Sequence, residues 1–228
     1  MKYKSIKEGI FLSRPNRFIA YVELDGQEQI VHVKNTGRCK EILIPGARVF
    51  LEESDNPARK TKYDLIAVYK GGNLINMDSQ APNKVFYEWA REYFGESAKI
   101  RPETKYKNSR FDCYIEAQGR KIFAEVKGVT LEIDGVAKFP DAPTERGVKH
   151  IEELCQAISE GYEAYIFFVV QMKGAKYFTP NYKTHRAFGE ALKTAKEKGV
   201  NIVCVDCTVT PDTLKIDKFI DVILEEKI

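Results

Sequence analysis

The chain has 228 residues, of which 43% are hydrophobic and 30% are charged, and its 36 Lys and Arg against 33 Asp and Glu leave a net charge of +3. This hydrophobic content excludes disorder as the main state, because it is enough to build a buried core. The small net charge excludes a polycation that coats nucleic acid over its whole surface. Five cysteines, an odd number, argue against a secreted disulfide framework.

The distribution of charge along the chain is uneven. Residues 1–92 carry the whole net charge of +3, while residues 93–228 are balanced and can hold a cluster of acids. No run approaches the roughly 18 apolar residues that a membrane span needs. The run Ile10–Leu12 is also too short for a signal peptide. We therefore expect a soluble cytoplasmic protein with no membrane partner.

The first 80 residues contain short strand-like runs separated by Gly and Asn turns. The runs are 18–23, 29–33, 47–52, 63–69 and 73–77. Five short strands at close spacing predict a small barrel. An OB-fold has this strand count and commonly binds oligonucleotides, so we predict an OB-like five-stranded β-barrel that binds DNA over residues 1–80.

A helical pattern begins at Pro82 and ends before Gly95, and we expect residues 81–98 to form a connecting helix and linker. Longer elements follow, with strands at 99–106, 110–117, 121–129, 165–170 and 201–207 and helices at 144–160 and 184–198. This pattern predicts an α/β domain over residues 81–228, with a mixed sheet flanked by helices. The fold class is therefore α+β with two domains.

Two of these runs flank the pair Gln118-Gly119 and read as a hairpin. If this pair is a two-residue turn, Asp112 on the first strand lies opposite Glu125 on the second. Because side chains alternate along a strand, Lys127 lies on the same face as Glu125. The other face is apolar throughout and consists of Phe111, Cys113, Ile115, Ile122, Ala124 and Val126.

Two carboxylates opposed on one face of a sheet destabilise the pair unless a positive charge lies between them. Mg²⁺ or Mn²⁺ would supply that charge, because both ions favour carboxylate oxygens. We predict that Asp112 and Glu125 bind the ion and that the Lys127 ammonium helps to activate water. The alternative is an exposed strand face on which Arg110 and Lys127 pair with the two acids.

The order Asp112, then Glu125-Val126-Lys127, resembles the catalytic core of the PD-(D/E)xK nuclease superfamily. Several further motifs resemble the sugar fermentation stimulation protein (SfsA) family over nearly the whole chain. They are Asn35–Arg38, Ser54–Pro57 with Arg59-Lys60, Ser109–Asp112, Glu125–Lys127, and Phe139–Gly147 with Lys149-His150. The resemblance implies an OB-like N-terminal domain, a nuclease-like C-terminal domain, and DNA binding without strong sequence preference.

Further acids are candidates to complete the metal site. Superfamily members often add a carboxylate from the helix before the sheet, which here is Glu88, and Glu103 on the first strand competes with it. Either side chain could equally be solvated. The backbone carbonyl of Val126 is a further predicted metal ligand, and a third carboxylate would tighten binding or admit a second ion.

Basic residues on loops and on one helix are predicted to contact DNA phosphates. On helix 144–160, Val148, Ile151, Cys155 and Ile158 form an apolar stripe. This stripe puts Arg146 and His150 on the opposite, polar face, where contact with phosphate or with the site competes with simple solvation. The predicted DNA-binding residues are Arg38, Lys40, Arg59, Lys60, Lys62, Arg110, Arg146 and His150.

The leading hypothesis is a DNA-binding protein that hydrolyses phosphodiester bonds with Mg²⁺ or Mn²⁺, as an endonuclease or exonuclease. The catalytic residues would be Asp112, Glu125 and Lys127. The alternative is a DNA-binding regulator of the sugar fermentation stimulation type, with a vestigial nuclease core. Double-stranded or single-stranded DNA is the expected partner, and a homodimer is left open.

Overall fold

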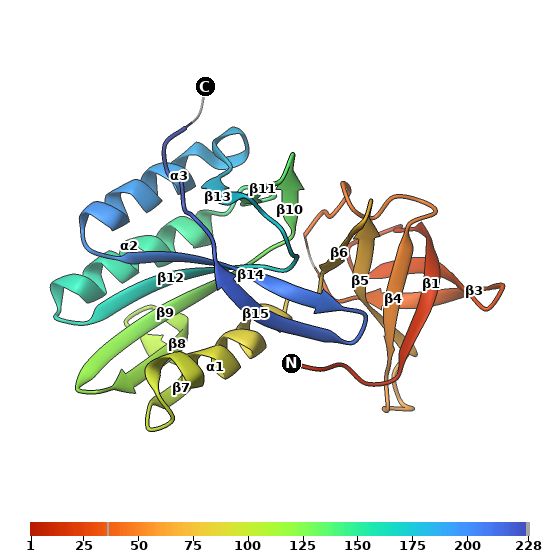
Figure 1. The fold of residues 1–228 in the computed structure, drawn as a ribbon, viewed down its shortest axis with the longest axis horizontal. Helices are drawn as coiled ribbons and strands as arrows, with labels where there is room; N and C mark the ends of the chain where they lie inside the picture. Colours follow the sequence, from red (N-terminus) through yellow and green to blue (C-terminus); the bar gives the residue numbers. More distant parts are fainter. Residues whose placement is uncertain (36, 227–228) are drawn as a thin grey trace.

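The chain folds into two domains that lie side by side, an all-β domain and an α/β domain (Figure 1). The computed structural model describes residues 1–35 and 37–226, so Thr36 in the Asn35–Arg38 motif lies outside the described residues. None of the described helices is long and apolar enough to cross a membrane.

The first domain is a barrel. Its strands are β1 (Ile6–Ser13), β2 (Ile19–Leu24), β3 (Gln27–Val33), β4 (Arg48–Glu53), β5 (Tyr63–Lys70) and β6 (Asn73–Asn76). They are ordered β3-β2-β1-β4-β5-β6, and a parallel pairing of β3 with β5 closes the first five into a ring. Inward residues such as Ala20, Val22 and Leu24 of β2 alternate with more exposed ones, as a barrel with one core requires.

The five-stranded barrel is confirmed, but its members differ from the predicted set. Strand β1 is absent from the predicted runs, and β6 pairs with β5 outside the closed ring. Only Gly9 and Phe11 of β1 are buried, so the strand shows little apolar alternation. Gly9 is required there, because an added Cβ would lie 2.7 Å from the Glu23 carbonyl oxygen of β2.

The second domain is built on a six-stranded mixed sheet. Its elements are α1 (Ala81–Phe94), β7 (Lys99–Tyr106), β8 (Ser109–Ala117), β9 (Arg120–Val129), β10 (Leu131–Ile133), β11 (Val136–Phe139), α2 (Glu145–Ser159), β12 (Glu163–Val170), β13 (Tyr177–Pro180), α3 (Tyr182–Glu197), β14 (Asn201–Thr210) and β15 (Thr213–Phe219). The sheet order is β15-β14-β12-β9-β8-β7. Helix α1 packs on one face, and α2 and α3 pack on the other (Figure 1).

Four strands of this domain are absent from the prediction. β10, β11 and β13 form a separate small sheet, and β15 extends the main sheet at its edge. The strands of the small sheet have three or four residues each, too few to show a period. The small sheet also contacts the barrel, because the Lys70 ammonium at the end of β5 lies 2.8 Å from Glu132 on β10.

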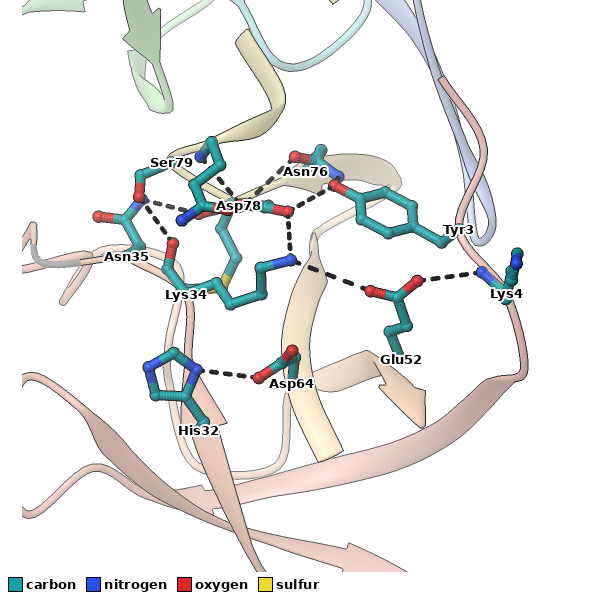
Figure 2. A network of polar contacts seen from close by, with 12 residues as sticks. Tyr3, Lys4, His32, Lys34, Asn35, Glu52, Asp64, Asn76, Asp78 and Ser79 are labelled. Atoms are coloured by element: carbon teal, nitrogen blue, oxygen red, sulfur yellow. Dashed lines mark hydrogen bonds and ion pairs between the residues drawn. The ribbon is translucent and has the colours of Figure 1, made fainter. Parts of the chain in front are cut away.

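A buried polar network joins the two domains (Figure 2). Its centre is Asp78, which is fully buried and accepts hydrogen bonds from the Lys34 ammonium at 2.9 Å and the Tyr3 hydroxyl at 3.2 Å. The Asn35 side chain donates to the Met77 carbonyl at 2.8 Å. From the second domain, the Gln171 amide donates to the Asp78 carbonyl at 2.9 Å. The residues between β6 and α1 are therefore held from both sides.

Candidate functional site

The hairpin of β8 and β9 has the predicted turn. Gln118 and Gly119 both have positive φ angles, +52° and +78°, which is the geometry of a two-residue type I′ turn. The strands pair in the predicted register, from Ala117 opposite Arg120 to Cys113 opposite Ala124.

The predicted facing of Asp112 and Glu125 is only partly correct, because the paired ladder ends one residue before them. Cys113 packs in the core under α1, whereas Phe111 packs on the α2 side, with its ring 5.2 Å from the Phe123 ring. The alternation of side chains is therefore broken at Asp112, and Phe111 does not belong to the predicted apolar face. The Asp112 side chain therefore does not lie directly opposite Glu125, and its carboxylate instead contacts the backbone of β9 at Val126.

Asp112 is held by three hydrogen bonds. One carboxylate oxygen accepts from the Asn83 amide at 3.0 Å, and the other accepts from the Val126 backbone N–H at 2.8 Å. The Tyr87 hydroxyl donates to the Asp112 carbonyl oxygen at 2.7 Å. Burial and the nearby charge of Glu125 raise the pKa of Asp112 to about 6, against these donors and Lys127.

Glu125 is more deeply buried, at 2% exposure. Its Oε1 accepts from the Lys127 ammonium at 2.5 Å and from Nδ1 of His150. Burial acts to raise the pKa of Glu125, but Lys127 and His150 outweigh it and hold the pKa below the usual value. The second oxygen, Oε2, is buried and has no hydrogen-bond partner in the described chain. A buried carboxylate oxygen without a partner is costly and points to a missing ligand.

His150 is buried, which corrects its predicted place on the polar face of the helix, and of its two predicted contacts, with phosphate or with the site, the structure has the one with the site. It is 4% exposed, and the buried face of α2 contains Gly147, His150, Ile151, Leu154 and Ala157. The Arg146 Nε–H donates to His150 Nε2 at 3.3 Å, so the ring proton lies on Nδ1 and points at Glu125. The Glu125 carboxylate accepts a hydrogen bond from His150, so a histidine is favourable on the buried face of α2. The apolar periodicity of the helix cannot show this, because Glu125 lies on another element.

The sequence prediction missed Asn83 and Tyr87, which α1 supplies to the site. They lie four residues apart and therefore on one side of the helix. Glu88, the predicted contributor from this helix, points elsewhere and lies 2.7 Å from the N-terminal ammonium of Met1. The prediction of Glu88 as a metal ligand is therefore wrong in geometry, and the helix contributes hydrogen-bond donors instead of an acid.

Glu103 lies near the site without joining it. Its neighbours Pro102 and Thr104 pair with Cys113 and Phe111, so Glu103 stands beside Asp112 on the adjoining strand. Its backbone has a φ of +51°, and its side chain is 58% exposed and pairs at 3.6 Å with Arg110. The positive φ turns the side chain off the strand face, so the structure leaves Glu103 at the rim.

The residues present fit a divalent ion held by two carboxylates. Within residues 1–35 and 37–226 there is no group of three or more His, Cys, Asp or Glu that could hold a metal. Mg²⁺ commonly takes only one or two protein carboxylates and completes its coordination with water and substrate phosphate. Asp112 and Glu125 offer that number, and Glu125 Oε2 offers a free oxygen. Val126 lies at the site through its N–H, and its carbonyl stays a predicted ligand.

The predicted DNA-binding residues of the barrel have different surroundings. Arg59 makes a bidentate pair with Asp64, at 2.9 and 2.5 Å, so its guanidinium is already occupied. Lys62 pairs with Glu53 at 2.8 Å on the surface, where such pairs are weak and exchange easily. Lys60 is exposed.

Arg38 and Lys40 line an open cleft of about 500 Å³, which the loop at Ala142 of the second domain also lines. Arg146 is exposed and donates to His150 of the candidate site, and Arg110 is exposed at the rim of that site. Of the eight residues predicted to bind DNA, two are not free to do so: His150 is buried, and the guanidinium of Arg59 is paired with Asp64. The others stay accessible.

Known proteins resemble the chain along its whole length. Residues 80–213 match the family described as "Sugar fermentation stimulation protein RE domain", and residues 12–77 match its "N-terminal OB domain". A sugar fermentation stimulation protein homolog of Desulfitobacterium hafniense is 63% identical over 99% of this chain and 100% of its own length. One of Clostridium beijerinckii is 60% identical over 98% and 100%. The solved structure of Pyrococcus furiosus SfsA in complex with Ca²⁺ superposes with a TM-score of 0.86 at 28% identity, covering 97% of each chain.

Proposed function

The chain belongs to the sugar fermentation stimulation protein family, and we propose that it is a DNA-binding protein that hydrolyses phosphodiester bonds with Mg²⁺ or Mn²⁺. Asp112, Glu125 and Lys127 are the proposed catalytic residues. The observation that carries the proposal is the buried, unpartnered Oε2 of Glu125 beside the carboxylate of Asp112. A divalent cation would give that oxygen a ligand and offset the repulsion between the two acids.

The side chains around the two acids suit a phosphodiester substrate. Lys127 is 18% exposed, and its ammonium, which has three donors, contacts only Glu125 among the residues that the structure describes. The remaining donors can hold a phosphate oxygen or orient the attacking water. His150 and Asn83 fix the two carboxylates in place. When bound, the ion would act as a Lewis acid on the phosphate and balance its developing charge.

The solved structure of a relative supports the proposal of a divalent metal ion at this site. The Pyrococcus furiosus protein was solved in complex with Ca²⁺, an ion that takes oxygen ligands as Mg²⁺ does. The same divalent chemistry in this chain is a proposal that rests on Asp112 and Glu125. The accessible Arg38, Lys40, Lys60 and Arg146 support DNA as the substrate, because phosphate contacts need little more than correctly placed Arg and Lys.

The test is to incubate the full-length protein with plasmid, single-stranded and branched DNA and Mg²⁺ or Mn²⁺. An Asp112→Ala, Lys127→Ala double variant is run beside it, with Asp221→Ala, Lys215→Ala as the matched control of two exposed residues. We expect metal-dependent cleavage that falls by about 10²-fold or more in the first variant and is unchanged in the control. If the unsubstituted protein binds DNA but does not cleave it with either ion, the proposed hydrolase activity is wrong.

A second function, a DNA-binding regulator with a vestigial nuclease core, is favoured by one observation. Lys127 balances the charge of Glu125 and His150 donates a hydrogen bond to it from within the protein, as in a scaffold that needs no ion. This function predicts that the chain binds DNA equally well with and without Mg²⁺ and cuts none of the substrates. The cleavage assay therefore decides between the two functions.

A further inference from the structure

The open cleft beside the barrel has a composition that differs from an ordinary surface groove. Four charged residues line it in the described chain, and all four are cationic: Arg14, Arg17, Arg38 and Lys40. The guanidinium of Arg14 donates hydrogen bonds to four backbone carbonyls, at 2.7 to 2.9 Å. The other three make no ion pair with any carboxylate in residues 1–35 and 37–226. They are therefore available for an anion.

Apolar side chains form the rest of the cleft wall. Phe11, Leu43 and Pro45 line it, and Leu43 leads directly to Ile44, which is 55% exposed. Phe18 follows the lining residue Arg17 in the chain, is 51% exposed, and has the guanidinium of Arg17 5.8 Å from the centre of its ring. A flat apolar surface with a cationic rim suits a ligand that has flat apolar rings and anionic groups together. Nucleotides have that composition, with bases that stack on aromatic side chains.

The position of the cleft is fixed relative to the metal site. Asn35, next to Lys34 of the junction network, accepts the Gly37 N–H at 2.7 Å, and Asp141 of the second domain accepts the Arg38 N–H at 3.3 Å (Figure 2 shows Lys34 and Asn35). Ala142 on the cleft wall precedes Arg146 of α2 by four residues in the chain, and Arg146 donates to His150. His150 donates in turn to Glu125. The cleft, which the barrel domain forms with Ala142, is thus connected to Glu125 through the start of α2.

We propose that this cleft binds single-stranded DNA, with Arg17, Arg38 and Lys40 on the phosphates and Phe18 under an unpaired base, and leads the strand to Asp112 and Glu125. The inference rests on the proposed DNA-binding function and names its substrate as a single strand or a splayed end. A cleft of about 500 Å³ accepts a ligand of roughly drug size, which is large enough for an unpaired nucleotide. Base pairs also keep their faces stacked and hide them from Phe18.

The test measures binding in EDTA, where the proposed cleavage cannot occur. Full-length protein is titrated into a fluorescein-labelled oligo-dT strand of about 20 nucleotides, or a duplex of equal length, and followed by anisotropy. The variant is Arg17→Ala, Arg38→Ala, Lys40→Ala. The matched control is Lys121→Ala, Lys196→Ala, Lys198→Ala, three exposed lysines at the β8–β9 turn and the end of α3, remote from the barrel (Figure 1).

We expect tighter binding of the single strand than of the duplex. The cleft variant should lose about tenfold or more in single-strand affinity, and its slope of log affinity against log salt should fall by roughly 2, because three phosphate contacts disappear. The control should change less than about twofold. Tighter binding of the duplex, or equal losses in both triple variants, overturns the inference.

Phe18→Ala supplies an independent readout, with Ile133→Ala as control because Ile133 is an exposed apolar residue of the other domain, at 46% exposure. We expect Phe18→Ala to weaken single-strand binding about fivefold or more and to leave the duplex unchanged. An equal effect on both DNAs contradicts a stacked base. Because no metal is present, failure of single-strand binding is distinct from failure of cleavage at Asp112 and Glu125.

Discussion

Asp112 and Glu125 are both largely buried acids, yet their charges are balanced by different kinds of group. Glu125 contacts two basic side chains, Lys127 and His150. The hydrogen-bond donors to Asp112 are a side-chain amide and a backbone N–H, which leave its charge uncompensated. In the metal-free protein Asp112 is therefore the acid that holds a proton as pH falls toward neutral, and a divalent ion would relieve it.

The raised pKa of Asp112 predicts how stability depends on pH in EDTA. The folded pKa of about 6 exceeds the reference value of 3.8, so folded Asp112 binds more protons between these values. Its contribution is fully favourable below about pH 4 and is lost as pH rises through about 6. Between pH 4 and 7 the unfolding free energy of Asp112→Asn should gain roughly 3 kcal/mol relative to the unsubstituted protein, as measured by urea unfolding. Parallel pH profiles for the two proteins would contradict the shifted pKa.

His150 is predicted to position Glu125 for the ion. His150→Ala removes one of the two donors to Oε1 and leaves only Lys127, so the carboxylate is held less firmly next to Asp112. We expect about 10- to 100-fold weaker Mn²⁺ binding by calorimetry. His150→Gln, whose amide can still donate to Glu125, should recover part of the affinity. The control is His32→Ala in the barrel, whose ring contacts Asp64. Equal Mn²⁺ affinity in all four proteins would remove His150 from the site.

At the scale of the element, the hairpin shows what sequence periodicity predicts and where it stops. The turn and the register from Cys113 to Ala124 are predicted correctly, because a Gly-containing pair between two apolar runs leaves one pairing. The break at Asp112 is not predictable in this way, because it depends on Val126 and on Asn83 from another element. The buried His150 likewise depends on Glu125 across the sheet.

The main elements were predictable because their sequences show a clear pattern, whereas the missed elements depend on contacts with distant parts of the chain. β12 is a long apolar run, and the helices α1 and α2 have a clear helical period. The short strands β10, β11 and β13 are stabilised by partners distant in the chain, such as β13 for β11. Strand β1 is hidden by Gly9. In each case tertiary contacts, not local preference, decide the structure.

The turn of the hairpin can be tested with a matched pair of glycines. Gly119 has a φ of +78° and Gly72 does not have a positive φ, and an added Cβ would meet no atom within 4 Å at either position. Gly119→Ala should therefore cost about 1–2 kcal/mol of unfolding free energy, because only the left-handed backbone penalises it. Gly72→Ala should be neutral or slightly stabilising. Urea denaturation measures both, and equal effects would argue against the type I′ turn.

At the scale of the whole molecule, the two domains are joined by buried polar contacts in addition to the chain itself. The Lys34–Asp78 pair is almost entirely desolvated, with side-chain exposures of 14% and 0%. Gln171, which donates to the Asp78 carbonyl, also packs closely against Gly128, the residue after Lys127 on β9. A Cβ added at Gly128 would lie 2.6 Å from the Gln171 side chain. The network thus links the barrel to the strand that carries Glu125 and Lys127.

Breaking this pair should uncouple the domains. Asp78→Ala leaves the buried Lys34 charge with only the more distant Glu52 carboxylate, at 3.9 Å, so the cost should lie near the lower end of about 3–5 kcal/mol. We expect the single calorimetric unfolding transition of the unsubstituted protein to split into two in the variant. Asp55→Ala, at an exposed position of the same domain, should leave one transition. A single transition for Asp78→Ala, shifted as a whole, would show that the domains stay coupled without the network.

The central claim is that Asp112 and Glu125 together bind a divalent ion. Anomalous diffraction from crystals soaked in Mn²⁺ tests it at the atoms concerned. We predict one strong peak within bonding distance of an Asp112 oxygen and of Glu125 Oε2, and no peak there in crystals of the Asp112→Ala variant. Crystals that take up Mn²⁺ elsewhere, or not at all, while Glu125 Oε2 contacts only protein or water, would contradict the claim.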